Sequence, residues 1–212
     1  MSPPCTQGRL LTFCLPVLSI LFLCGCSGAG AGAGATRVGA LPYRRIAVVE
    51  FYDGSQYSSY GYGGDLSRAL VEKLSDRTES ADFVLLPQAA LRARETPFVS
   101  GKLPLGILVQ ARKEYLADAA IVGSLNEIDP YRMPSAQISL KLVDTSTGEV
   151  LVSLSEGWDA GDGGVHKRLE DYCRRNCGSG DCKYGTDMFL NSPRYFLRFV
   201  ADQVAEKVVV SL

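Results

Sequence analysis

The sequence has little of the chemistry that hydrolases and nucleotide-binding proteins need. It holds one histidine, His166, in a Gly-rich stretch, and no G-x-S-x-G motif, so a Ser-His-Asp hydrolase is not supported. Gly61-Tyr62-Gly63-Gly64 lacks both the G-K-[ST] of a P-loop and the spacing of a dinucleotide fingerprint. We interpret these glycines as a strand-to-helix turn that needs flexible backbone, rather than as an anion cradle. We expect no enzyme activity and no cofactor.

The chain also lacks a run of basic residues. Its 22 Lys and Arg and 23 Asp and Glu give a formal net charge of −1. Phosphate binding needs clustered Lys and Arg, so nucleic acid is not an expected partner. Glu50 and Asp53 could form a carboxylate pair, and Asp159 and Asp162 could hold calcium, but neither pair matches a motif of defined spacing. We expect no metal site.

No apolar run is long enough for a permanent transmembrane helix. The run from Leu10 to Leu23 follows one charged residue, Arg9, and falls short of the ~20 residues that cross a bilayer. It fits the h-region of a signal peptide over residues 1–25. Removing that segment deletes one arginine and no acidic residue, which leaves 21 basic and 23 acidic residues.

The motif after this run, Leu23-Cys24-Gly25-Cys26, resembles the lipobox of bacterial lipoproteins. The resemblance implies cleavage before Cys26, a diacylglycerol on its sulfur and a fatty acid such as palmitate on its amino group, which together anchor a protein in a membrane. Ser27, rather than Asp, resembles lipoproteins of the outer membrane, so we expect an exported protein there, facing the periplasm. The alternative is a secretory signal cut near Ala29-Gly30-Ala31, which would release a soluble protein.

Three cysteines remain after signal removal and lipidation: Cys173, Cys177 and Cys182. An exported protein meets oxidising conditions, which favour a disulfide over a zinc site. Three cysteines allow one disulfide and one leftover thiol, with three pairings open. The Gly178-Ser179-Gly180 turn favours Cys177–Cys182 weakly. A zinc site with His166 would need H-x6-C-x3-C-x4-C, which matches no standard spacing.

Hydrophobic patterning predicts a single mixed α/β domain over residues 43–212, preceded by a Gly/Ala-rich tether at 26–42. β-Branched apolar runs predict strands buried on both faces, and alternating runs predict a β-hairpin with one solvated face. Leucines at i+4 spacing predict the first helix, with Asp65 as its N-cap. The expected order is strand 44–51, helix 64–74, strand 82–87, helix 104–115, strands 119–123, 136–143 and 149–155, and a helix from 193.

Several segments resemble a known group when taken in order. They are RRIAVVEF, GDLSRALVEKL, ADFVLLPQAALRA, YLADAAIVGSL and ISLKLVDTSTGEVLVS. Together they resemble the CsgG-like/TolB N-terminal-like group of bacterial envelope lipoproteins, which includes the curli secretion channel CsgG, the exopolysaccharide component PelC and the peptidoglycan-synthase activator LpoB. The resemblance covers roughly residues 43–157 and the last helix. It implies a lipid-anchored, non-catalytic scaffold that acts through protein–protein contacts, often in rings.

The chain departs from this group in two places. The connections at 52–63 and 96–102 are too short or too polar to supply transmembrane strands of ~9–11 residues, so no pore is expected. The Gly- and Asp-rich, Cys-containing insertion at 158–187 matches no part of the group. We therefore expect an adaptor or scaffold in secretion, polysaccharide export or cell-wall synthesis. Its partners would be other envelope proteins or further copies of itself.

The loop YDGSQYSSYGYGG supplies a candidate contact surface: Tyr52, Tyr57, Tyr60 and Tyr62. Tyrosine among Ser and Gly is typical of adaptable binding surfaces, because large amphipathic rings cost little conformational entropy. Such a surface supports an alternative function, a module that binds glycan or peptidoglycan. A surface loop without a partner is the plainer interpretation.

Overall fold

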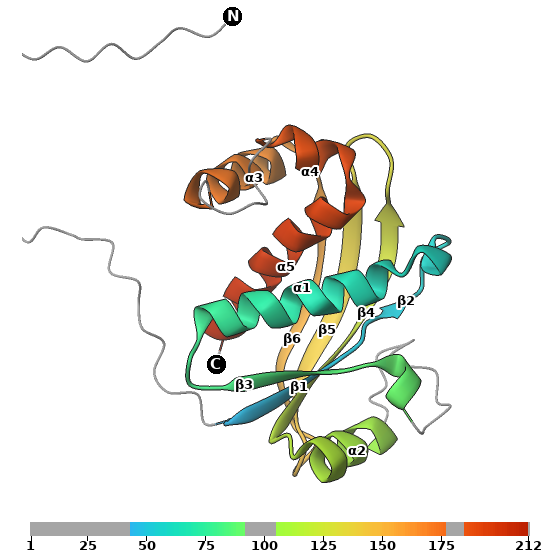
Figure 1. The fold of residues 1–212 in the computed structure, drawn as a ribbon, viewed down its shortest axis with the longest axis vertical. Coiled ribbons are helices and arrows are strands. Elements are labelled where there is room, and N and C mark those ends of the chain that lie inside the picture. The colour runs from blue at the N-terminus through green and yellow to red at the C-terminus, as the bar shows by residue number, and fades with distance from the viewer. Residues whose placement is uncertain (1–42, 92–104, 177–184, 212) are drawn as a thin grey trace, which may run out of the picture. The chain divides into compact units, whose positions relative to one another are not determined.

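A mixed β-sheet forms the centre of the fold (Figure 1). The computed structural model describes residues 43–91, 105–176 and 185–211, all within the second of two units, residues 37–212. The sheet has the order β3-β1-β4-β5-β6, with parallel pairing from β3 to β4 and antiparallel pairing from β4 to β6; β2 pairs with β4. The mixed α/β class is confirmed. The strands are β1 (Arg45–Val49), β2 (Tyr52–Asp53), β3 (Asp82–Leu86), β4 (Ala119–Asp129), β5 (Ser135–Asp144) and β6 (Val150–Asp159).

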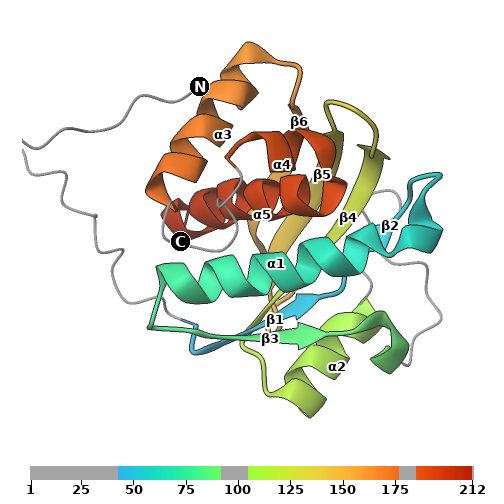
Figure 2. The ribbon, with the colours of Figure 1, turned by 45° about the horizontal axis from the view of Figure 1, so that its top comes forward.

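Strand β1 is buried on both faces, as its apolar run predicted. Ile46 and Val48 belong to the larger hydrophobic core, which includes side chains of α1 (Tyr62–Arg77) and α5 (Pro193–Val210). Ala47 and Val49 belong to a second cluster under α2 (Leu105–Tyr115). Figure 2 shows α1 and α5 lying side by side on one face of the sheet and α2 on the other. Burial of both faces explains why β1 is apolar from Ile46 to Val49, whereas Arg45 at its edge is only partly buried.

The antiparallel half of the sheet keeps one face polar. Ser124 Oγ donates to Asn126 Oδ1 at 2.7 Å, and Asn126 Nδ2 donates to Ser139 Oγ at 2.8 Å. The Ser139 hydroxyl lies 3.1 Å from that of Ser155 on β6. The hairpin of β5 and β6 therefore has the solvated face that its alternating sequence predicted.

One helix lies inside the segment 158–187, which the sequence predicted only as an insertion, and a second begins at its last residue. They are α3 (Gly163–Arg175) and the short α4 (Asp187–Asn191). Val165, Leu169 and Tyr172 of α3 face the main core, and Asp162 caps the helix by accepting from the N–H of Val165 at 2.9 Å. Within the described ranges, no helix is both long and apolar enough to cross a membrane.

The start of α1 differs from the prediction. The helix begins at Tyr62, and the N-cap position is taken by Gly61, whose φ of 73° lies in the left-handed region. Asp65 as N-cap is therefore wrong, because it lies inside the first turn, where its charge still favours the positive end of the helix. Glycine adopts a positive φ at little cost, so the helix can begin immediately after a tight turn.

The β5–β6 turn is organised by Asp144. Its Oδ1 accepts from the N–H of Ser146 at 2.7 Å, from the Ser146 hydroxyl at 2.5 Å and from the N–H of Thr147 at 2.9 Å. These bonds, first the Ser146 hydroxyl and then the backbone of Thr147, lower the pKa of Asp144 from 3.8 to about 2. The ionised carboxylate thus stabilises the turn.

Replacing Asp144 tests this role. We expect Asp144→Ala to lower the free energy of unfolding by about 1–2 kcal/mol at about pH 6, because three bonds to a charged acceptor are lost. The folded pKa lies below the unfolded one, so this stabilisation is complete above about pH 4 and is lost as the pH falls through about 2. Urea unfolding of both proteins at several pH values should show the difference shrinking on acidification. The exposed Asp76→Ala is the control, and an equal effect of both variants would contradict the account.

Candidate functional site

The end of β1 and the start of α1 approach each other closely. A Cβ on Gly63 would lie 2.4 Å from the carbonyl oxygen of Phe51 and 3.3 Å from Cβ of Asp53. The fully buried Ser67 Oγ accepts from the N–H of Phe51 and donates to the carbonyl of Gly63, both at 2.8 Å. The glycine is therefore needed for packing of backbone on backbone. This geometry supports the turn interpretation over the anion cradle.

The candidate carboxylates are engaged in local structure. Glu50 Oε2 accepts from the N–H of Gln88 at 2.8 Å. Asp53 Oδ1 accepts from both the N–H and the hydroxyl of Ser55, at 3.0 and 2.6 Å. These contacts hold the two carboxyl groups in different turns rather than as a facing pair.

The candidate calcium and zinc ligands are likewise separate. Asp159 Oδ1 accepts from the N–H of Gly161 at 2.7 Å, while Asp162 caps α3. His166 lies on the partly exposed side of α3, with Nε2 3.6 Å from Glu170 Oε1. Among the residues that the structure describes, no group of three or more His, Cys, Asp or Glu is arranged to hold a metal ion.

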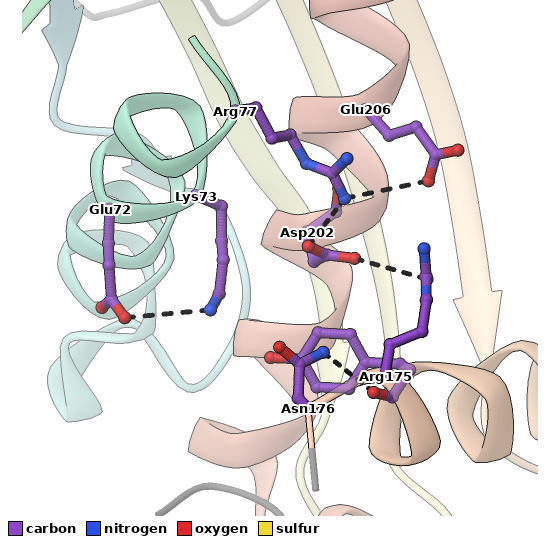
Figure 3. Close-up of polar contacts among 8 residues, drawn as sticks. Glu72, Lys73, Arg77, Arg175, Asn176, Asp202 and Glu206 are labelled. Carbon is purple, nitrogen blue, oxygen red and sulfur yellow. Dashed lines mark hydrogen bonds and ion pairs between the residues drawn. The ribbon is translucent and has the colours of Figure 1, made fainter. Parts of the chain in front are cut away.

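A cluster of charged side chains joins α1, α3 and α5 (Figure 3). Arg77 Nη2 lies 2.8 Å from Asp202 Oδ1 and 3.9 Å from Glu206 Oε2, and Arg175 approaches the other oxygen of Asp202 at 3.9 Å. Asp202 is only 8% exposed. Because the charges compensate each other across three helices, we interpret the cluster as an ionic link in the helical layer. It offers no group for chemistry.

The tyrosines of the loop form an aromatic cluster. Tyr60 stacks on Tyr62 with ring centroids 5.8 Å apart, and Tyr57 lies 6.3 Å from Tyr60. Tyr60 is 62% exposed, whereas Tyr62 is buried, and burial raises the pKa of Tyr62. Tyr52 belongs to β2 and is half-buried. The loop tyrosines therefore differ in role: Tyr57 and Tyr60 offer ring surface, and Tyr62 anchors the loop in the core.

The structure adds a fifth ring that the sequence analysis missed. Tyr131, in the turn between β4 and β5, packs edge-on against Tyr57 with centroids 5.8 Å apart and is 66% exposed. A side-chain hydrogen bond with Tyr131 raises the pKa of Tyr57. The strand before this turn was predicted to end at Gly123, but β4 continues to Asp129. Had the strand been predicted to its true end at Asp129, Tyr131 would have been expected at the same end of the sheet as the loop YDGSQYSSYGYGG (the Tyr loop).

The predicted cysteine and lipid sites are mostly untested. Cys173 lies in α3, is 7% exposed and belongs to the main core. Cys177 and Cys182 lie outside the described residues, as does Cys26. The disulfide pairing and the lipidation therefore stay predictions.

Comparison with known proteins gives similarity only to solved structures, since no protein-family model and no curated protein matches the sequence. The PelC dodecamer from Paraburkholderia phytofirmans is 16% identical over 79% of this chain and 85% of that one, with a TM-score of 0.45. Lipoprotein GNA1162 from Neisseria meningitidis is 14% identical over 64% and 97%, with a TM-score of 0.41. The LpoB C-terminal domain from Salmonella enterica is 14% identical over 57% and 87%, with a TM-score of 0.33. These values carry no argument about what this chain binds.

The packing role of Gly63 can be tested against a matched glycine. We expect Gly63→Ala to destabilise the fold by about 2–3 kcal/mol, because the new Cβ would force the Phe51 carbonyl to move. At Gly163, in the first turn of α3, a new Cβ would meet no described atom within 4 Å. Gly163→Ala should therefore change stability by less than about 0.5 kcal/mol. Thermal or urea unfolding measures both, and equal stabilities would contradict the packing argument.

Proposed function

We propose that this protein is a lipid-anchored envelope adaptor of the CsgG-like group, which binds and organises other proteins of a secretion, polysaccharide-export or wall-synthesis system. The observation that carries the proposal is the lipobox-like Leu23-Cys24-Gly25-Cys26 after an apolar run of signal-peptide length. Acylated Cys26 would hold the protein at the outer membrane, facing the periplasm.

The geometry of the domain supports a role in which the aromatic cluster contacts a partner protein. The described chain begins beside the β5–β6 turn, where burial and the neighbouring Asp144 carboxylate raise the pKa of Tyr43. The Tyr loop follows the opposite end of β1, next to the end of β4. The start of the described chain and the aromatic cluster lie at opposite ends of β1 (Figure 1). A tether preceding the described chain would therefore leave the cluster free to meet a partner. Tyrosine-rich surfaces suit such contacts.

The candidate acids and the histidine also fit a role in binding rather than in turnover. Glu50, Asp53, Asp162 and His166 each contact neighbours within turns or helices instead of converging on one point. General acid–base catalysis requires such groups within hydrogen-bond reach of a common reacting atom. We therefore assign the protein no reaction, and propose other envelope proteins or further copies of this chain as its partners.

Two adjacent cysteine variants test the anchor. We expect Cys26→Ser, made with its own signal, to lose palmitate labelling and to move from the membrane to the soluble fraction, because no acyl chain can attach to serine in this way. Cys24→Ser changes the variable position of the motif and should stay membrane-bound. Isolation of the Cys24→Ser protein from membranes should also recover envelope proteins in fixed ratio. A Cys26→Ser protein that fractionates and labels like its control would contradict the proposal.

A further inference from the structure

Two turns border a hollow of about 320 Å³ at the end of the sheet. The first turn belongs to the Tyr loop, where Ser55 Oγ donates to Asp53 Oδ1 at 2.6 Å and accepts from the N–H of Tyr57 at 3.2 Å. Further along the same loop, the N–H of Tyr60 donates to the carbonyl of Tyr57 at 3.0 Å. This wall is therefore fixed by its own hydrogen bonds before any ligand binds, which lowers the entropic cost of binding.

The second turn joins β4 to β5. Asp129 Oδ1 accepts from the N–H of Tyr131 at 3.0 Å, and the N–H of Met133 donates to the carbonyl of Leu190 at 3.3 Å. Pro130 and Pro134 flank the turn and restrict its backbone further. The exposed ring of Tyr131 is thus presented in a defined orientation against Tyr57.

The lining of the hollow is aromatic and polar rather than aliphatic. An amide comes from Gln56 and carboxylates from Glu127 and Asp129, beside the two tyrosine rings. The Asn126 amide also lines the hollow, but it is engaged with Ser124 and Ser139. Ile128 also lines it but is only 2% exposed. A protein side chain would find no apolar pocket here to fill, whereas a ligand rich in hydroxyl groups would find both acceptors and donors.

We propose that this hollow binds an uncharged pyranose ring of a glycan. One face of such a ring is covered by C–H groups and packs on an aromatic ring, here Tyr131, while its hydroxyls donate to carboxylate oxygens and exchange bonds with amides. The volume lies at the small end of the ~300–1,000 Å³ range of ligand sites, so one or two sugar residues would be held. This site is independent of the lipid anchor and goes beyond the adaptor role.

The charge of the lining selects among sugars. Glu127 and Asp129 are both acidic and both exposed. A uronic or sialic acid would bring a like charge next to them and would bind more weakly than a neutral sugar. Neutral hexoses and N-acetylhexosamines share the chemistry that fits, and the choice between them is an outcome of the test.

The test is a binding titration with the mature lipidated protein in detergent. The probes are cellohexaose, chitohexaose and an oligogalacturonate of equal length. Isothermal titration calorimetry measures the affinity of each. We expect saturable binding of at least one neutral oligosaccharide, and weaker binding of the acidic one. Tyr131→Ala should weaken binding about fivefold or more, and Tyr131→Phe, which keeps the ring, should stay within about twofold. Asp129→Asn keeps an acceptor for the N–H of Tyr131 and should reduce the discrimination against oligogalacturonate.

Val109→Ala, which truncates an exposed side chain on α2, is the matched control and should bind like the parent protein. Failure of both neutral oligosaccharides to bind at millimolar concentration would overturn the proposal. Equal affinities of Tyr131→Ala and Val109→Ala would do the same, as would tighter binding of the acidic oligosaccharide. None of these results would affect the membrane anchor, which the cysteine variants test separately.

Discussion

The contact between the end of β1 and the start of α1 is the constraint on which the described domain depends. The Phe51 backbone and Gly63 approach so closely that no Cβ fits between them, and buried Ser67 hydrogen-bonds to both segments. Because the contact closes the chain on itself, the residues after β2 must leave the sheet and return as a compact loop. That loop carries the partly buried Tyr57 and the exposed Tyr60, so a packing requirement in the core determines where these rings lie.

The same sheet separates two ends with different tasks. The described chain begins at Tyr43, beside the β5–β6 turn that Asp144 holds together. The aromatic surface lies beyond the other ends of β1 and β4. The helices on this sheet are linked to one another. The Arg77–Asp202 ion pair joins α1 to α5, and the buried ring of Tyr172 on α3 packs against Phe189 and Phe199.

Much of the fold follows from sequence patterns, and the failures have physical causes. The apolar run of β1 and the alternation in Ala136–Val143 predicted their burial correctly, because burial on two faces or one leaves a direct signature. Helix α3 was missed because it begins with two glycines, and because its few apolar residues are separated by many charged ones. Tyr131 could not be paired with Tyr57 because the contact joins turns far apart in the chain. Only the structure shows that these rings and the Asp129 carboxylate border one hollow.

The most direct test of the account is a native mass measurement on the protein extracted in mild detergent from membranes of cells that make it with its own signal. We expect a protomer that begins at Cys26 and carries diacylglycerol and a fatty acid, in a defined complex with envelope proteins or with further copies of itself. The contrary result is an unlipidated monomer that begins within the Gly/Ala tract. It would remove the membrane anchor and with it the proposed adaptor function.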